Sequence, residues 1–255
     1  MSRIQLLNTE IDNLTMQEAL NRIDALARAE EPAYVVTPNL DHIVTMERDA
    51  HFREAYAHAD LILADGKPLL WIAKAKHTPI IEKISGSDLF PRVAELASRR
   101  GYTMYFLGAA EGVAEQAAEN LIEQYPGLII SGCYAPPLGF EYDKTAIREI
   151  VDRVREAKPD ILVVGLGTPK QEKFLYRYYK QMGVPVSLGL GASFDFAAGN
   201  RKRAPRWMSE HGLEWLYRTL QEPGRLAGRY LKDAVYILPI LIKYRNRKRH
   251  YEDIR

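Results

Sequence analysis

Five polar or glycine-rich segments of this 255-residue sequence each follow a short apolar run, and their residue types suit hydrogen bonding, proton transfer and anion binding. They are Thr37–Asp41, Asp65–Pro68, Gly108–Ala110, Gly165–Gln171 and Gly189–Ser193. If the apolar runs are parallel strands, their carboxyl ends lie along one edge of a sheet, where open α/β folds bind ligands. That edge is where we expect the chemistry.

Asp65 is the candidate for proton transfer. It follows the apolar run Leu61–Ala64 and precedes Gly66. A carboxylate at a buried strand end can have a raised pKa and serve as a general base. Alternatively, Asp65 caps a helix that begins near Gly66. The sequence leaves both interpretations open.

The segment Gly165–Gln171 is suited to a phosphate group. Gly167 permits close approach of a ligand to the backbone. Thr168 occupies an N-cap position, Pro169 fits the first helical position, and Gln171 would complete a capping box. A helix N-terminus with free N–H groups can bind a diphosphate. The segment could equally be only a well-capped turn, since a lone GxG is weak evidence.

Thr37 and Asn39 offer a hydroxyl and an amide to the hydroxyls of a sugar, and Pro38 restricts Thr37 to an extended conformation. Turn formation is the alternative. His42 has no second histidine at metal-ligand spacing, and the sequence contains no Asp-x-Asp pair. We therefore expect neither a metal site nor a cofactor.

The elements that would position these residues alternate between strands and helices. β-type runs such as Ala33–Thr37, Leu61–Ala64 and Ile161–Val164 alternate with helical patterns such as Lys144–Ala157, and Thr15 with Glu18 forms a capping box. This alternation predicts an α/β fold, a mainly parallel Rossmann-like sheet flanked by helices. We expect residues 1–199 to form this core and residues 200–255 a helical appendage.

Charge is distributed unevenly between these two parts. Residues 199–255 contain 14 Lys+Arg against 6 Asp+Glu, whereas residues 1–198 carry a net charge of −6. Arg203 lies in the basic run Asn200–Arg206, which could neutralise a diphosphate or an anionic lipid, or could simply be solvated. Aromatic residues and the nine-residue apolar run Ala234–Ile242 accompany the tail arginines. Such a tail is typical of a membrane-interface helix rather than of a nucleic-acid-binding surface.

Two further features bear on location. The run Ala234–Ile242 is far shorter than the ~20 residues needed to span a bilayer, so no membrane-spanning helix is expected. The single Cys133 excludes an intramolecular disulfide and fits the reducing cytoplasm.

Motifs along nearly the whole chain resemble the WecG/TagA/CpsF family of bacterial glycosyltransferases, glycosyltransferase family 26. They are Thr37–His42, Ala59–Gly66, Ser85–Asp88, Phe106–Ala109, Pro136–Phe140, Val164–Lys173, Gly189–Gly199, Arg203–Met208 and Gly212–Arg218. The resemblance implies a metal-independent, inverting transfer from a UDP-sugar donor to an undecaprenyl-diphosphate-linked sugar, on the inner face of the bacterial cell membrane. The type that makes the teichoic acid linkage unit joins N-acetylmannosamine to N-acetylglucosamine through a β-1,4 bond.

The resemblance also implies roles for residues. Asp65 corresponds to the general base, Thr37 and Asn39 to sugar contacts, and Gln171 to a donor or acceptor contact. Arg218 and Arg225 best match arginines with which the membrane-associated appendage covers the diphosphate, and Lys83 stands where relatives often carry Arg. We add Gly108, Gly167, Gly191 and Arg203 as expected substrate-binding positions, and a homo-oligomer is possible because relatives associate through the core.

Several alternatives remain at this point. The donor could be UDP-glucose or UDP-N-acetylmannosaminuronic acid, or the chain could be a non-catalytic module that binds a sugar nucleotide or a lipid. A Rossmann-type dehydrogenase is disfavoured because the segment after Ala33–Thr37 contains no glycine.

Overall fold

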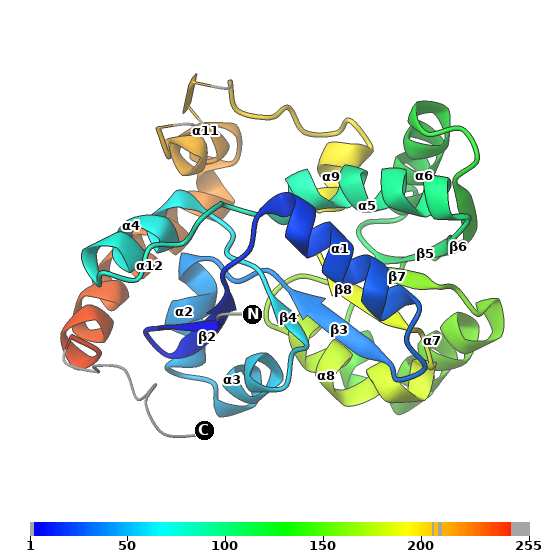
Figure 1. The fold of residues 1–255 in the computed structure, drawn as a ribbon, viewed down its shortest axis with the longest axis horizontal. Coiled ribbons are helices and arrows are strands. Elements are labelled where there is room, and N and C mark those ends of the chain that lie inside the picture. The colour runs from blue at the N-terminus through cyan, green and yellow to red at the C-terminus, as the bar shows by residue number, and fades with distance from the viewer. Residues whose placement is uncertain (1–2, 206, 209–210, 246–255) are drawn as a thin grey trace.

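A six-stranded, all-parallel sheet forms the centre of the protein (Figure 1), as the alternating pattern predicts. The computed structural model describes residues 3–205, 207–208 and 211–245. The strand order is β4-β3-β8-β7-β5-β6. The strands are β3 (Ala33–Val36), β4 (Leu61–Ile62), β5 (Thr103–Gly108), β6 (Ile129–Tyr134), β7 (Ile161–Gly165) and β8 (Val186–Gly189).

Alternate side chains of the strands enter two separate hydrophobic cores, one on each face of the sheet. Val36 and Val164 enter the first core, and their chain neighbours Val35 and Val163 enter the second. Because successive side chains of a strand point to opposite faces, a continuous apolar run is expected of a sheet that is covered on both sides. The two cores hold the carboxyl ends of the strands in fixed positions.

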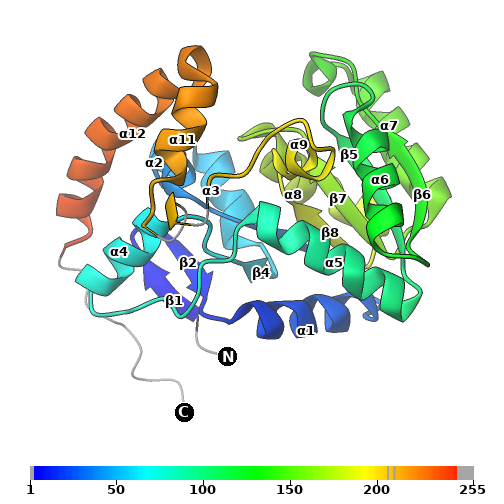
Figure 2. The same cartoon turned by 90° about the horizontal axis from the view of Figure 1, so that it is seen from above.

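Helices cover both faces (Figure 2). The first core includes residues of α2, α3, α4, α7, α8 and the C-terminal helix α12 (Pro223–Lys243), and the second core those of α1, α5, α6 and α9. The helices before the C-terminal segment are α1 (Met16–Ala27), α2 (Leu40–Met46), α3 (Ala50–Ala57), α4 (Lys67–Ala75), α5 (Gly86–Arg100), α6 (Val113–Gln124), the 3₁₀ turn Phe140–Tyr142, α7 (Lys144–Ala157), α8 (Lys170–Met182) and α9 (Ser193–Ala197).

Local sequence signals predict several of these elements well. The capping box of Thr15 and Glu18 is present at the start of α1, and α7 has the expected bounds. The helical spacing of Ile43, Met46 and Ala50 in the sequence predicts one helix, but the structure has two, because the Asp49 side chain accepts the Phe52 N–H at 3.0 Å and begins α3 anew. The antiparallel hairpin of β1 (Arg3–Leu6) and β2 (Thr9–Asp12) is not predicted from the sequence.

The C-terminal segment contains α11 (Glu214–Gln221) and α12 (Pro223–Lys243). Figure 2 shows α12 beside α2, where Glu47 accepts hydrogen bonds from Lys243 Nζ at 2.7 Å and from the Tyr244 hydroxyl at 2.8 Å. Lys76 Nζ also donates to the Tyr244 carbonyl at 2.7 Å. Within the described residues, none of the helices combines the length and apolar character needed to cross a bilayer. The domain boundary at residue 200 stays a prediction.

Candidate active site

The polar segments singled out in the sequence lie along one edge of the sheet, because all six strands are parallel. Asp65 follows β4, Thr37 follows β3, Gly191 follows β8 and Gly167 follows β7, while Gly108 is the last residue of β5. Neighbouring strands are about 4.8 Å apart, so the four strand spacings from β4 to β5 cover about 19 Å. A ligand must be elongated to reach from Asp65 to Gly108.

Asp65 does not cap a helix. The N-cap residue of α4 is Gly66, and it makes no side-chain capping hydrogen bond. The Asp65 N–H donates to the Pro38 carbonyl at 2.8 Å, which ties the segment after β4 to the segment after β3. The backbone is thus fixed, while the carboxyl group makes none of the hydrogen bonds found in the described part of the chain. The capping alternative is therefore wrong.

The Asp65 carboxyl lies in surroundings that keep its proton. Desolvation is the largest cause and raises its pKa from 3.8 to about 7, with Glu214 and Asp88 adding to the increase. Lys83 and Arg218 act in the opposite direction. A carboxyl that titrates near neutral pH can accept a proton during a reaction and release it afterwards, which is what a general base requires.

Lys83 is the centre of a charged cluster next to Asp65, which we define as Lys83, Asp88, Arg203 and Glu214. Lys83 Nζ lies 3.2 Å from Asp88 Oδ2 and 3.6 Å from Glu214 Oε2. Arg203 Nη1 lies 2.7 Å from Asp88 Oδ1. Because Glu214 belongs to α11, the charged cluster joins the C-terminal segment to the loop before α5. Sequence reasoning missed Asp88 and Glu214.

Arg218, one turn after Glu214 on α11, provides a second cation to the surroundings of Asp65. Its guanidinium carbon lies 5.9 Å from the centre of the Phe196 ring on α9. The structure thus brings Asp65, Lys83 and Arg218 into one electrostatic environment. The side chain of Arg225, the other arginine expected over the diphosphate, lies outside the described part of the chain.

Thr37 and Asn39 are held at the end of β3. The Thr37 hydroxyl is buried and donates to the Gly189 carbonyl at 3.4 Å. Asn39 is the N-cap of α2, and its Oδ1 accepts the N–H groups of Asp41 and His42. The turn-forming role is therefore real for Asn39. Because Oδ1 is used in this way, the amide nitrogen is the Asn39 group that remains suited to a ligand oxygen.

His42 connects the segments after β3 and β7. Its Nδ1 accepts the Asn39 N–H at 3.1 Å, which places the proton of a neutral imidazole on Nε2, 2.5 Å from the Thr168 hydroxyl oxygen. The capping box predicted for Thr168 and Gln171 is therefore wrong. Pro169 is the N-cap residue of α8, without a side-chain capping bond, and the Thr168 hydroxyl contacts His42 instead.

Gln171 lies in the first turn of α8 and is 3% exposed. Its Oε1 accepts the Gly191 N–H at 2.9 Å, and its Nε2 donates to Glu172 Oε1 at 3.0 Å. Glu172 is 1% exposed, and desolvation raises its pKa from 4.5 to about 7. Sequence reasoning missed Glu172, because a Glu in the first turn of a helix is usually interpreted as compensation of the helix dipole.

Two of the predicted glycine positions differ in their surroundings. Gly108 has φ +104°, and a Cβ there would lie 2.6 Å from the Gly165 carbonyl oxygen, so its small size is needed where β5 and β7 end side by side. Gly167 has φ +77° and open space where a side chain would be. The second position is the one at which a ligand could approach the backbone closely.

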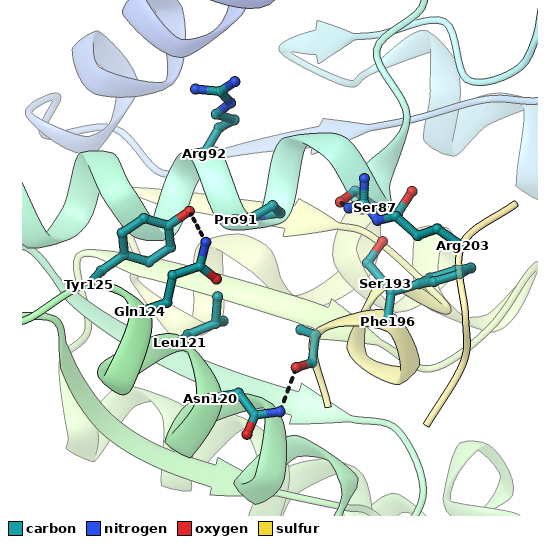
Figure 3. A pocket seen from close by; sticks show the side chains of 11 residues that line it. Ser87, Pro91, Arg92, Asn120, Leu121, Gln124, Tyr125, Ser193, Phe196 and Arg203 are labelled. Atoms are coloured by element: carbon teal, nitrogen blue, oxygen red, sulfur yellow. Dashed lines mark hydrogen bonds between the residues drawn. The ribbon is translucent and has the colours of Figure 1, made fainter. Parts of the chain in front are cut away.

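A pocket of about 540 Å³ lies between α5, α6 and α9 (Figure 3). Arg203 and Ser193 are at one end, and Tyr125 and Gln124 at the other. At the first end the pocket meets the charged cluster, because Arg203 belongs to that cluster and pairs with Asp88. Asp65 does not line this pocket. Within the described residues, no group of three or more His, Cys, Asp or Glu side chains is arranged to hold a metal ion.

The parallel sheet with charged and polar groups at its carboxyl edge is that of a Rossmann-like glycosyltransferase fold. Residues 4–251 match the Glycosyl transferase WecG/TagA/CpsF family, and the chain belongs to this family.

Among similar proteins is the N-acetylglucosaminyldiphosphoundecaprenol N-acetyl-beta-D-mannosaminyltransferase of Bacillus spizizenii, 33% identical over 86% of this chain and 83% of that protein. The protein of the same name from Bacillus subtilis is 31% identical over 86% of this chain and 83% of its own. A third, from Staphylococcus aureus, is 26% identical over 94% and 92% of the two chains.

Proposed function

We propose that this protein transfers N-acetylmannosamine from UDP-N-acetylmannosamine to N-acetylglucosaminyl-diphospho-undecaprenol, with inversion and formation of a β-1,4 bond. The names of the similar proteins support the acceptor and the sugar that is moved. The observation that carries the proposal is the Asp65 carboxyl, whose pKa is raised to about 7 beside the cations Lys83 and Arg218. The product would enter teichoic acid or another surface polysaccharide.

Asp65 acts as the general base in this proposal. Its carboxylate accepts the proton of the acceptor hydroxyl while that oxygen bonds to the anomeric carbon of the donor sugar. The bond from the anomeric carbon to the phosphate oxygen breaks on the opposite side, and UDP leaves with the bonding electrons. Inversion follows from this in-line geometry. A positioned base contributes typically 10²- to 10⁴-fold to such a reaction.

Cationic groups stabilise the departing diphosphate. Lys83, Arg203 and Arg218 are the described cations in or beside the charged cluster, and Arg225 is expected to join them. Charge stabilisation aimed at the leaving group lowers the barrier because negative charge grows there in the transition state. Thr37 and Asn39 would contact the sugar, and the edge from β4 to β5 is long enough for an extended sugar nucleotide.

An exposed apolar stripe on α12 supports peripheral membrane binding. The opposite side of this helix packs into the protein through Leu226, Ile237 and Ile240. The stripe comprises Leu231, Val235, Leu238 and Ile242, which are 58–75% exposed. Their spacing of four, three and four residues puts them on one side of the helix. Such a helix can lie in the interface of an anionic membrane, where a lipid-linked acceptor is found.

A transfer assay with a panel of donors tests the function. We expect UDP-N-acetylmannosamine with a synthetic prenyl-diphosphate N-acetylglucosamine to give a disaccharide product with a β-1,4 bond. UDP-glucose and UDP-N-acetylmannosaminuronic acid are the competing donors. If the protein preferred either of them, the proposed identity of the donor would be wrong. Binding of UDP-sugars without transfer to any acceptor would contradict the proposed transferase activity.

Vesicle flotation tests the membrane role. The variant L231Q/V235Q/L238Q/I242Q should lose binding to anionic vesicles. The control I122Q/I129Q/L138Q, which changes exposed apolar residues outside the C-terminal segment, should bind like the parent protein. Equal flotation of both variants would show that the stripe does not contact lipid.

A further inference from the structure

Glu172 is a buried carboxyl group to which the proposed mechanism gives no role. It lies in the first turn of α8, and its Oε2 has no hydrogen-bond partner among the described residues. Its other oxygen, Oε1, accepts a hydrogen bond from Gln171 Nε2 at 3.0 Å. Burying a polar atom without a partner costs free energy of folding. The burial of the Glu172 carboxyl therefore needs an explanation, and its contact with Gln171 is the place to look for one.

The Gln171 amide is held at both ends. Glu172 accepts from its nitrogen, and the Gly191 N–H donates to its oxygen at 2.9 Å. An amide rotated by 180° would place its nitrogen against the Gly191 N–H and its oxygen against Glu172 Oε1. Both contacts would then be lost. The Gly191 N–H, which can only donate, and the accepting Oε1 of Glu172 therefore select one orientation of the amide together.

The chain on the other side of Gln171 is shaped to receive this amide. Gly189, the last residue of β8, lies against it, and a Cβ at that position would be 2.8 Å from Gln171 Nε2. The Gly189 carbonyl in turn accepts the Thr37 hydroxyl. Gln171 thus fixes the backbone between Gly189 and Gly191, at the point where β8 and β3 end next to each other.

We propose that Glu172 is a positioning residue that holds the Gln171 amide in the one orientation able to fix the Gly191 backbone at the carboxyl end of β8. Desolvation is the largest cause that raises the pKa of Glu172, and the charge of Asp41 on α2 adds to the increase. A carboxyl in such surroundings keeps its proton up to neutral pH, and the neutral group can accept from the amide without a buried charge.

The effect of Glu172 on turnover rests on the proposed function, whereas its effect on the position of the Gly191 backbone does not. Two measurements separate them. Hydrogen exchange of the segment 189–193 reports the Gly191 N–H directly, whatever reaction the protein performs. Steady-state kinetics with UDP-N-acetylmannosamine report the effect on donor use.

The variants are E172L, E172Q, Q171A and the double variant Q171A/E172L. E172Q retains a carbonyl oxygen for Gln171 Nε2, while E172L removes every acceptor. We expect faster exchange of segment 189–193 in E172L and Q171A, no faster exchange in the double variant than in Q171A, and parent-like exchange in E172Q. Loss of one hydrogen bond gives up to about a tenfold increase.

In kinetics, we expect E172L to lower kcat/KM for the donor by about tenfold and to have less than about twofold further effect in the Q171A background. E172Q should recover most of the loss. Melting temperatures identify variants that fail to fold. If E172L is one of them, E172Q remains as the variant that tests the inference.

Three results would overturn the inference: unchanged exchange in E172L, independent effects that multiply in the double variant, or E172Q as impaired as E172L. If the parent protein transferred no sugar but the exchange pattern held, the proposed function would fail and the positioning role of Glu172 would stand.

Discussion

Asp65 and Glu172 are two carboxyl groups whose pKa is raised by desolvation to about 7, in regions of the molecule that differ in exposure and in the presence of cations. Asp65 is partly exposed at the end of the edge strand β4 and is influenced by Lys83 and Arg218 from two different segments. Glu172 is 1% exposed, with an amide as its described hydrogen-bond partner.

The comparison shows that a raised pKa does not by itself define a catalytic group. In the proposed mechanism an acceptor hydroxyl approaches Asp65, and Lys83 and Arg218 stabilise the charge of its carboxylate. At Glu172 the surrounding side chains exclude a substrate, so its proton state affects only the protein. Access and the sign of the neighbouring charges distinguish a reacting carboxyl from a positioning one.

Replacing Asp65 should have the largest effect on activity. In D65N the amide has nearly the same shape but cannot accept a proton, so we expect kcat to fall by 10²- to 10⁴-fold. Donor binding, measured by calorimetry with the UDP-sugar, should change by less than about threefold. E172Q is the matched control, because it makes the same change at the other carboxyl and should retain most activity. Near-normal turnover in D65N would show that Asp65 is not the general base.

The positions of the expected site residues could be predicted from the sequence, because the residue after a parallel strand always lies at the same edge. Asp65, Thr37 and Gly167 are readable in this way from apolar runs alone. Local caps are readable in part: the capping box of Thr15 and Glu18 is present, whereas the one expected of Thr168 and Gln171 is not.

The contacts that organise the site could not be predicted, because they join residues far apart in the chain. His42 and Thr168 are separated by 126 positions, and Lys83 meets Glu214 only because α11 lies close to the loop before α5. Glu172 was missed for a related reason. Its burial depends on how α8 packs against the sheet and α3, which periodicity does not specify.

Replacing Glu172 should change stability more than activity. The folded protein keeps the Glu172 proton up to about pH 7, whereas the unfolded chain loses it near the ordinary value of 4.5. The parent protein therefore loses stability as pH rises from about 4.5 to 7, by about 3 kcal/mol for this group. E172Q should lack this loss, so its melting temperature relative to the parent should rise by several degrees between pH 4.5 and pH 8.

The exposed Glu123 on α6 provides the control for that series. E123Q should show the same difference from the parent at both pH values. A difference between E172Q and the parent that does not vary with pH would mean that folding leaves the pKa of Glu172 unchanged.

Removing a positive or a negative charge next to Asp65 should have the smallest effects on activity, but the effects should be the most specific, because the two changes shift the pH profile in opposite directions. Lys83 lowers the pKa of Asp65 and Glu214 raises it. The base must be ionised to act, so kcat/KM should rise with pH through this pKa. K83A should move the rise to higher pH and E214Q to lower pH, each by about one pH unit or less. Because the two side chains also pair with each other at 3.6 Å, the double variant should lie between the single ones. Shifts in the same direction in both single variants would show that the pH profile reports a group other than Asp65.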